Sequence, residues 1–181
     1  MTLWLLRHAL PLVKPGVCYG QLDVAADRTA TTACAAALHP LLPKQLNVVA
    51  STLQRCDLLA HTLVGLQPNW HVKRDTRLQE MAFGNWEGRP WADIAEAELT
   101  AWTDDFAHYR AGGTGESTTQ FMARVGNAFD ALDPTQDTLW VTHAGVIRAA
   151  RLLAGGVRHI STARHWPAHA PGYGQWCKLE L

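Results

Sequence analysis

Two histidines in this chain each follow a short apolar run. Arg7-His8 comes directly after residues 3–6, which read Leu-Trp-Leu-Leu, and His143 follows residues 139–142. Such runs are typical of strands buried on both faces, and open α/β sheets bind ligands beyond the carboxyl ends of such strands. We therefore expect both imidazoles to face one crevice. Because imidazole acts near neutral pH and arginine binds anions, the pattern indicates phosphate chemistry.

Hydrolysis of a phosphomonoester would use these groups directly. The reaction is very slow without a catalyst, and the negative charge of the phosphate repels nucleophiles. Arg7 and Arg55 can neutralise that charge, because a guanidinium fork binds two phosphate oxygens. Arg55 falls in the first turn of a predicted helix, beside its free amide groups. His8 can then attack phosphorus as a neutral imidazole, while His143 stabilises charge on the transferring group.

The leaving group also needs a proton, and Glu80 is the carboxylate that the sequence favours for this role. Its neighbours Met81, Phe83 and Trp86 are expected to form an apolar wall that raises the pKa of the carboxyl toward neutrality. Glu87 is the competing candidate. A general acid of this kind accelerates a reaction by roughly 10²- to 10⁴-fold, so it would assist the nucleophile but not replace it.

Composition narrows the classes of function. The 181 residues are 48% hydrophobic, which fits one domain with a single core. Lys plus Arg equals Asp plus Glu at 16 each, so no overall charge would recruit nucleic acid or a membrane surface. The opening apolar run ends at Arg7, too early for a membrane span or a signal peptide. We expect a cytosolic protein with a small-molecule substrate and with reduced, mostly buried cysteines.

Local patterns predict alternating strands and helices around a long loop at residues 11–27, which is rich in proline and glycine. An amphipathic helix should follow the strand at 47–50, with Ser51-Thr52 as its cap. Ser117 and Gln120 have the spacing of a capping box that starts a helix reaching residue 132. The other predicted elements are helices at 28–38, 91–100, 101–109 and 144–153, a short strand at 71–74 and an edge strand at 174–181.

The motifs together resemble those of the histidine phosphatase superfamily, also called phosphoglycerate-mutase-like proteins. They are Arg7-His8 after a first strand, Ser51 and Arg55 at a helix start, Glu80 before Phe83-Gly84-x-Trp86-Glu87-Gly88, Gly115-Glu116-Ser117, and Thr142-His143-Ala144-Gly145. The resemblance implies a three-layer α/β/α sandwich whose mostly parallel sheet carries helices on both faces. It also implies a phosphohistidine at His8, a phosphate pocket of Arg7, Arg55 and His143, Glu80 as proton donor, and neither metal nor other cofactor.

The loop at residues 15–24 looks like the corresponding segment of α-ribazole phosphatases, which serve cobalamin assembly. That likeness makes α-ribazole 5'-phosphate a candidate substrate, with Tyr19 and Gln21 as candidate substrate contacts. Lys14 is a further candidate, because it stands where the family commonly has asparagine and could offer a charge to phosphate. The family mutases usually carry extra insertions over the site, and this short chain has little room for them, so hydrolysis is favoured over transfer.

One segment departs from the family pattern. After the nucleophile the family usually has glycine, an acidic residue and a hydroxyl residue, where this chain has Ala9, Leu10 and Pro11. The departure concerns the substrate entrance more than the reacting groups. Three alternatives stay open: a phosphomutase, a protein phosphohistidine phosphatase, and a catalytically silent module that binds a phosphorylated ligand. The sequence also leaves the oligomeric state open, a homodimer included.

Overall fold

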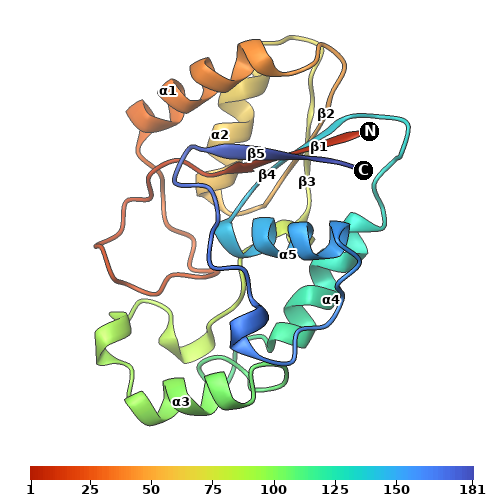
Figure 1. Cartoon of the computed structure of the whole chain (residues 1–181). Helices are drawn as coiled ribbons and strands as arrows, with labels where there is room; N and C mark the ends of the chain where they lie inside the picture. Colours follow the sequence, from red (N-terminus) through yellow and green to blue (C-terminus); the bar gives the residue numbers. More distant parts are fainter.

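A five-stranded mixed sheet forms the centre of the computed structural model, which describes all 181 residues (Figure 1). The strands lie in the order β3-β2-β4-β1-β5, and all neighbouring pairs are parallel except β1 with β5. Antiparallel β5 therefore forms one edge, as the sequence predicts for the last segment. The strands are β1 (Thr2–Arg7), β2 (Asn47–Ala50), β3 (Val72–Arg74), β4 (Thr138–Thr142) and β5 (Trp176–Glu180).

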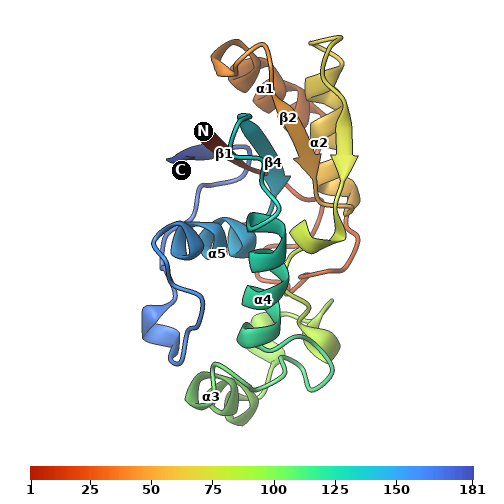
Figure 2. The ribbon, with the colours of Figure 1, turned by 90° about the vertical axis from the view of Figure 1, so that its right-hand side faces the viewer.

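Helices cover both faces of the sheet, and each face has its own hydrophobic cluster. Helices α1 (Arg28–Leu38) and α2 (Gln54–Val64) pack on one face, and α4 (Thr118–Phe129) and α5 (Ala144–Ala154) pack on the other (Figures 1 and 2). The predicted three-layer α/β/α sandwich is thereby confirmed. None of the helices combines the length and apolar character that crossing a bilayer requires.

The register of β1 with β4 brings the two predicted histidine positions together. Arg7 is the register partner of Thr142, and the His8 amide donates to the Thr142 carbonyl at 3.0 Å. Every residue of β4 is buried, which explains why the apolar residues 139–141 follow one another without alternation. Both strands thus end at the same edge of the sheet, where ligands of open α/β sheets bind.

The secondary structure between β3 and α4 differs from that predicted from the sequence. Helices were expected at 91–100 and 101–109, but the structure has a short 3-10 turn at Trp91–Asp93 and one helix, α3 (Glu96–Asp104). Helix α3 lies beyond the sheet, on the side of α4 and α5 (Figures 1 and 2). The extended backbone of Ile94 separates turn from helix, and its side chain is buried. Tertiary packing thus overrides the weak helical propensity of this segment.

Two predicted helix starts have different outcomes. The capping box is confirmed, because Gln120 N donates to the Ser117 hydroxyl and Ser117 N donates to the Gln120 side chain. The predicted Ser51-Thr52 cap is wrong, because Leu53 occupies the cap position of α2 without any side-chain hydrogen bond. The Ser51 hydroxyl accepts from the Leu53 amide at 3.4 Å and also bonds a histidine, as described below.

The four cysteines are free thiols, and three of them are buried, as predicted. Burial raises the pKa of Cys18 to about 12 and that of Cys34 to about 11. Both thiols therefore stay protonated and unreactive near neutral pH.

Candidate active site

His8 and His143 lie side by side at the carboxyl ends of β1 and β4. Their ring centroids are 5.2 Å apart, and the exposed fractions are 2% for His8 and 0% for His143. The two rings are therefore adjacent, but both are buried and neither is among the residues that line the adjoining cavity. Two neighbouring imidazoles removed from bulk water can act together on a single phosphoryl group.

The ring of His8 is oriented by the backbone of the next residue. Its Nδ1 lies 2.8 Å from the Ala9 carbonyl oxygen, which can only accept, so Nδ1 carries the hydrogen. The other nitrogen, Nε2, is then unprotonated and has a free lone pair. Burial and then the nearby Arg55 guanidinium lower the pKa of His8 to about 3. At neutral pH the imidazole is therefore uncharged, as a nucleophile must be.

Two guanidinium groups surround this ring, and neither is paired with a carboxylate. The fully buried Arg55 donates to the carbonyl oxygens of Leu22 at 2.9 Å and Gly20 at 2.6 Å. Arg7 donates to the Pro171 carbonyl at 3.0 Å. The Nε atoms of both arginines are buried without a hydrogen-bond partner. Because a buried donor is costly to leave unpaired, these N–H groups are suited to anionic oxygens.

His143 is held by side chains from the start of α2. Its Nε2 lies 2.8 Å from the Ser51 hydroxyl and 3.4 Å from the Cys56 sulfur. Burial, then Arg55, lowers the pKa of His143 well below the ordinary value. His143 is therefore neutral at pH 7 and can offer an N–H to a phosphate oxygen. The sequence marked Ser51 only as a helix cap, since nothing local predicts a bond to a residue on another strand.

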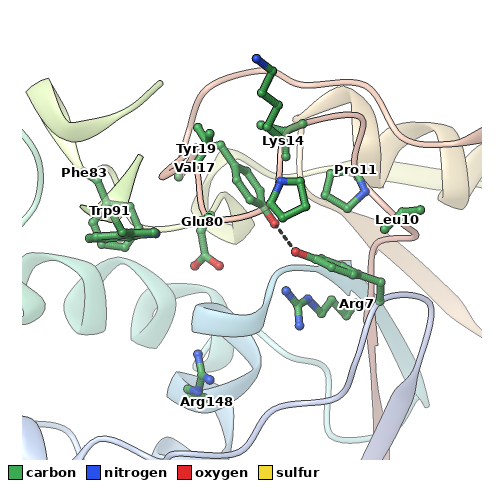
Figure 3. Close-up of a pocket in the computed structure, with 15 residues that line it drawn as sticks. Arg7, Leu10, Pro11, Lys14, Val17, Tyr19, Glu80, Phe83, Trp91 and Arg148 are labelled. Carbon is green, nitrogen blue, oxygen red and sulfur yellow. Dashed lines mark hydrogen bonds between the residues drawn. The ribbon is translucent and has the colours of Figure 1, made fainter. Parts of the chain in front are cut away.

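Glu80 is fixed above the site by two backbone amides. Its Oε2 accepts from the N–H of Gly145 at the start of α5, and its Oε1 accepts from Met81, each at 3.0 Å. Figure 3 shows its carboxylate projecting into a cavity between Tyr19 and Arg148. Glu80 therefore occupies a position from which it can reach a leaving group.

The other carboxylate considered from the sequence is placed elsewhere. Glu87 accepts from the backbone amides of Gln21 and Phe83, each at 2.9 Å, and does not line the cavity. The expected wall around Glu80 is only partly present. Phe83 lines the cavity, but Trp86 is completely buried among other aromatic rings, and its indole N–H donates to Glu98.

The cavity has a volume of about 500 Å³. Lys14 and Tyr19, both predicted substrate contacts, line it (Figure 3). The third predicted contact, Gln21, does not, since its side chain donates to the Glu80 carbonyl at 3.0 Å. Leu10 and Pro11, from the segment that departs from the family pattern, form part of the wall. Leu10 and Pro11 therefore help to shape the cavity.

A pair of tyrosines lies next to the ring of His8. The hydroxyls of Tyr19 and Tyr173 are hydrogen-bonded at 3.0 Å (Figure 3), and their rings lie 6.4 and 5.5 Å from that of His8. The Arg7 guanidinium stacks 4.0 Å from the Tyr173 ring centroid. The pairing of Tyr19 with Tyr173 spans 154 positions and has no local signal in the sequence.

The family model of the histidine phosphatase superfamily (branch 1) matches this chain over residues 3–180. The chain belongs to the histidine phosphatase superfamily. The predicted family and the phosphatase class of the enzyme are thereby confirmed. The match spans the elements that carry His8, Arg55, Glu80 and His143.

The relatives of this chain include phosphatases that are named for different substrates. Glucosyl-3-phosphoglycerate phosphatase of Mycobacterium tuberculosis is 30% identical over 176 residues, which cover 88% of this chain and 76% of the relative. The mycobacterial glucosyl-3-phosphoglycerate phosphatase solved with VO3 superposes with a TM-score of 0.80 at 29% identity, covering 99% of this chain and 92% of that one. A candidate alpha-ribazole-5'-P phosphatase from Escherichia coli gives a TM-score of 0.83 at 27% identity, covering 98% and 89%.

The buried neutral histidines should make the stability of this phosphatase fall in acid. Unfolded histidine has a pKa near 6.5, whereas that of folded His8 is about 3. Below pH 6.5 the unfolded chain therefore binds a proton that the folded chain does not. We expect His8 to lower the free energy of unfolding by about 1.4 kcal/mol per pH unit between these two values, with no effect above them.

Chemical denaturation across pH 4 to 8 measures this slope. His8→Asn should show a shallower decline than the wild type, whereas the same change at exposed His71 should leave the slope unaltered. His143, with its lowered pKa, should add a similar contribution. Equal slopes for His8→Asn and the wild type would contradict the assignment of His8 as a buried neutral group.

Gly145→Ala should separate activity from stability. A Cβ at this position would overlap the Glu80 carboxylate, so the side chain of Glu80 must move. Alanine is favoured over glycine in a helix by up to about 1 kcal/mol, which offsets the hydrogen bonds that the displaced Glu80 loses, so we expect a nearly unchanged Tm. Turnover of alkyl phosphates should fall by about 10- to 100-fold, because the misplaced acid cannot protonate the leaving group. Steady-state kinetics and thermal unfolding of the same sample check both expectations.

Gly126→Ala is the matched control. Gly126 lies on α4, and a Cβ there would make only ordinary contacts with the side chains of Leu153 and Arg158. It should leave turnover unaltered. Wild-type activity in Gly145→Ala would show that the carboxylate does not need its observed position.

Proposed function

We propose that this protein is a metal-independent phosphomonoesterase that hydrolyses a small phosphorylated metabolite through a phosphohistidine at His8. The observation that carries the proposal is the bond from His8 Nδ1 to the Ala9 carbonyl, which leaves Nε2 free in a site lined by unpaired guanidinium N–H groups. The charge of phosphate would be neutralised by Arg7 and Arg55, with His143 donating a further hydrogen bond. The protein's own side chains thus supply the positive charge.

In the first step His8 Nε2 attacks phosphorus. The N–P bond forms as the bond from phosphorus to the leaving oxygen breaks, and that oxygen takes the proton of Glu80. The charge-assisted bonds from Arg7 and Arg55 contribute roughly 1.5 to 3 kcal/mol each to binding. Such donors accelerate the step only to the extent that they hold the transition state more strongly than the bound substrate.

In the second step water attacks phosphorus on the phosphohistidine. The Glu80 carboxylate takes a proton from that water, the N–P bond breaks, and inorganic phosphate leaves. His8 returns to its neutral form and Glu80 to its protonated form, so the cycle closes without any added oxidant, metal or second substrate. One carboxyl group therefore serves first as general acid and then as general base.

Two observations favour hydrolysis of a metabolite over the alternatives. A phosphomutase would need its intermediate held over the site, and this short chain has little room for the insertions that the family mutases use for that purpose. A protein phosphohistidine phosphatase would tend to lack the Glu80 segment, which this chain has. Its relatives point to α-ribazole 5'-phosphate and glucosyl-3-phosphoglycerate as the first substrates to examine.

A panel of phosphomonoesters assayed with and without a chelator tests the proposal. It should contain α-ribazole 5'-phosphate, glucosyl-3-phosphoglycerate and 3-phosphoglycerate. We expect release of inorganic phosphate at the same rate in both conditions. Chelator-sensitive turnover would contradict metal independence, and isomerised phosphoglycerate in place of free phosphate would indicate a mutase. Saturable binding without turnover of any member would instead indicate a silent phosphate-binding module.

A further inference from the structure

The motif Gly115-Glu116-Ser117 is unused by the proposed reaction, although Ser117 caps α4. The Glu116 carboxylate pairs with Arg124 on that helix. Its Oε1 accepts from Arg124 Nε at 2.8 Å, and its Oε2 accepts from Nη2 at 2.7 Å. Both side chains are 19% exposed, and neither lines the proposed catalytic cavity. Two parallel charge-assisted bonds of this kind fix the orientation of a guanidinium group.

Every N–H donor of the Arg124 guanidinium has a partner within the protein. Two of its five N–H groups donate to Glu116. Nη1 donates to the carbonyl oxygens of Arg77 at 2.8 Å and Gln79 at 2.9 Å. Nη2 donates to the carbonyl oxygen of Glu80 at 3.2 Å. Arg124 therefore has no donor left for an anionic substrate, and its bonds run to the backbone that carries the proposed acid.

The backbone that Arg124 contacts belongs to no helix or strand. Residues 79–83 lie between two short 3-10 turns, so no regular ladder of hydrogen bonds fixes their course. Glu116 bonds this segment at a second point. Its Oε2 accepts from the Ala82 N–H at 3.0 Å, and its own N–H donates to the Ala82 carbonyl at 2.8 Å. The ion pair therefore bonds the chain on both sides of Glu80.

The backbone and the carboxylate of Glu80 are bonded to different helices. Arg124 on α4 donates to its carbonyl, whereas Gly145 at the start of α5 donates to its carboxylate. Helices α4 and α5 pack in one hydrophobic cluster, so together these bonds set where the carboxylate lies in the cavity. A displacement of about 1 Å at a reacting group can cost roughly 100-fold in rate. The position of this backbone therefore bears directly on proton transfer.

We propose that Glu116 and Arg124 are positioning residues whose ion pair fixes the backbone of Glu80. The proposal rests on the proposed phosphatase reaction, in which Glu80 is the proton donor. Neither residue of the pair would touch the substrate. The pair would act only through the proton transfers that Glu80 performs, which distinguishes it from an ion pair that merely stabilises the fold.

Arg124→Met tests the proposal through the leaving group. Methionine fills much of the same space but donates no hydrogen bond. The kcat/KM for an alkyl phosphate should fall by about 10- to 100-fold, because a displaced Glu80 cannot protonate an alkoxide. The kcat/KM for nitrophenyl phosphate should fall by less than about threefold, since nitrophenolate leaves without much help. In a Glu80→Gln background, Arg124→Met should not change the ratio of the two values further, because the proton that it positions is already gone.

Arg77→Met is the matched control. Arg77 pairs with Asp75 at 2.7 Å, and its Nη1 donates to the Asn127 carbonyl of α4 at 2.8 Å. Its replacement therefore removes an ion pair and a bond to the same helix without removing a contact to Glu80. We expect Arg77→Met to preserve the ratio of alkyl to aryl kcat/KM.

Glu116→Gln keeps the proposal testable if Arg124→Met does not fold. Glutamine has the same shape, but one of its two oxygens is replaced by an NH2 group, which would face the Arg124 guanidinium. We expect the ratio of alkyl to aryl kcat/KM to fall by about 3- to 10-fold. An unaltered ratio in the folded variants, or an equal fall in Arg77→Met, would overturn the proposal.

The backbone amide of Gly145 separates this proposal from the phosphatase reaction. Its NMR signal reports the hydrogen bond to the Glu80 carboxylate, whether or not the protein turns over substrate. We expect an upfield shift of the amide proton in Arg124→Met and none in Arg77→Met. If the signal moves while Glu80→Gln leaves the ratio unaltered, the positioning stands and the acid role of Glu80 is excluded. If Glu80→Gln alters the ratio while Arg124→Met changes neither signal nor ratio, the acid role stands and the positioning is overturned.

Discussion

Replacing His8 with asparagine is expected to reduce kcat by at least about 10⁴-fold, toward the roughly 10⁶-fold loss seen when a covalent nucleophile is removed. Asparagine can still donate to the Ala9 carbonyl that now accepts from His8 Nδ1, but it has no counterpart of Nε2. The positive pocket of Arg7 and Arg55 would remain. We therefore expect phosphate esters to bind to the variant without being cleaved.

The covalent intermediate gives this prediction a second measurement. Mixing the wild type with substrate and quenching in alkali should leave a phosphoryl group on the peptide that contains His8, and the variant should show none. The exposed His71→Asn provides the control, because it removes an imidazole far from the site and should retain both turnover and labelling. Normal turnover in His8→Asn would exclude the proposed mechanism.

The strand-end histidines could be predicted from the sequence because their position depends on local pattern. Apolar runs before His8 and His143 identify buried strands, and parallel strands that pair end at the same edge. Arg55 follows the same logic, since its place in the first turn of α2 depends only on the strand and helix beside it. Residue type and spacing therefore specified where His8, His143 and Arg55 lie in the fold.

The contacts that hold these groups could not be predicted in this way. Ser51 bonds His143 across 92 positions, and the Pro171 carbonyl accepts from Arg7 across 164. Each contact exists only after the sheet has formed, and neither has a signal in the nearby sequence. The same reason explains why Trp86 was wrongly predicted to form a wall beside Glu80. Its position next to Glu80 in the sequence suggested that role, but its packing partners come from α3 and the turn before it.

Glu80→Gln is expected to distinguish substrates by their leaving groups. Glutamine can still accept a hydrogen bond from Gly145, but it has no proton to give. An alkoxide leaves poorly without protonation, so kcat for alkyl phosphates should fall by roughly 10²- to 10⁴-fold. A nitrophenolate leaves without much help, so nitrophenyl phosphate should lose less than about tenfold. The ratio of the two rates in the same enzyme preparation measures the effect.

Glu87→Gln is the comparison that assigns the acid. Glu87 joins the loop at Gln21 to the backbone at Phe83, so its replacement should weaken both reactions together if it affects either. A change in the ratio of alkyl to aryl turnover can arise only where a proton is delivered to the leaving oxygen. If Glu87→Gln alters that ratio and Glu80→Gln does not, Glu87 is the acid and must reach the cavity by a movement of the loop. If only Glu80→Gln alters that ratio, Glu80 is the acid, and the hydrogen bonds from the backbone amides of Met81 and Gly145 hold it in place.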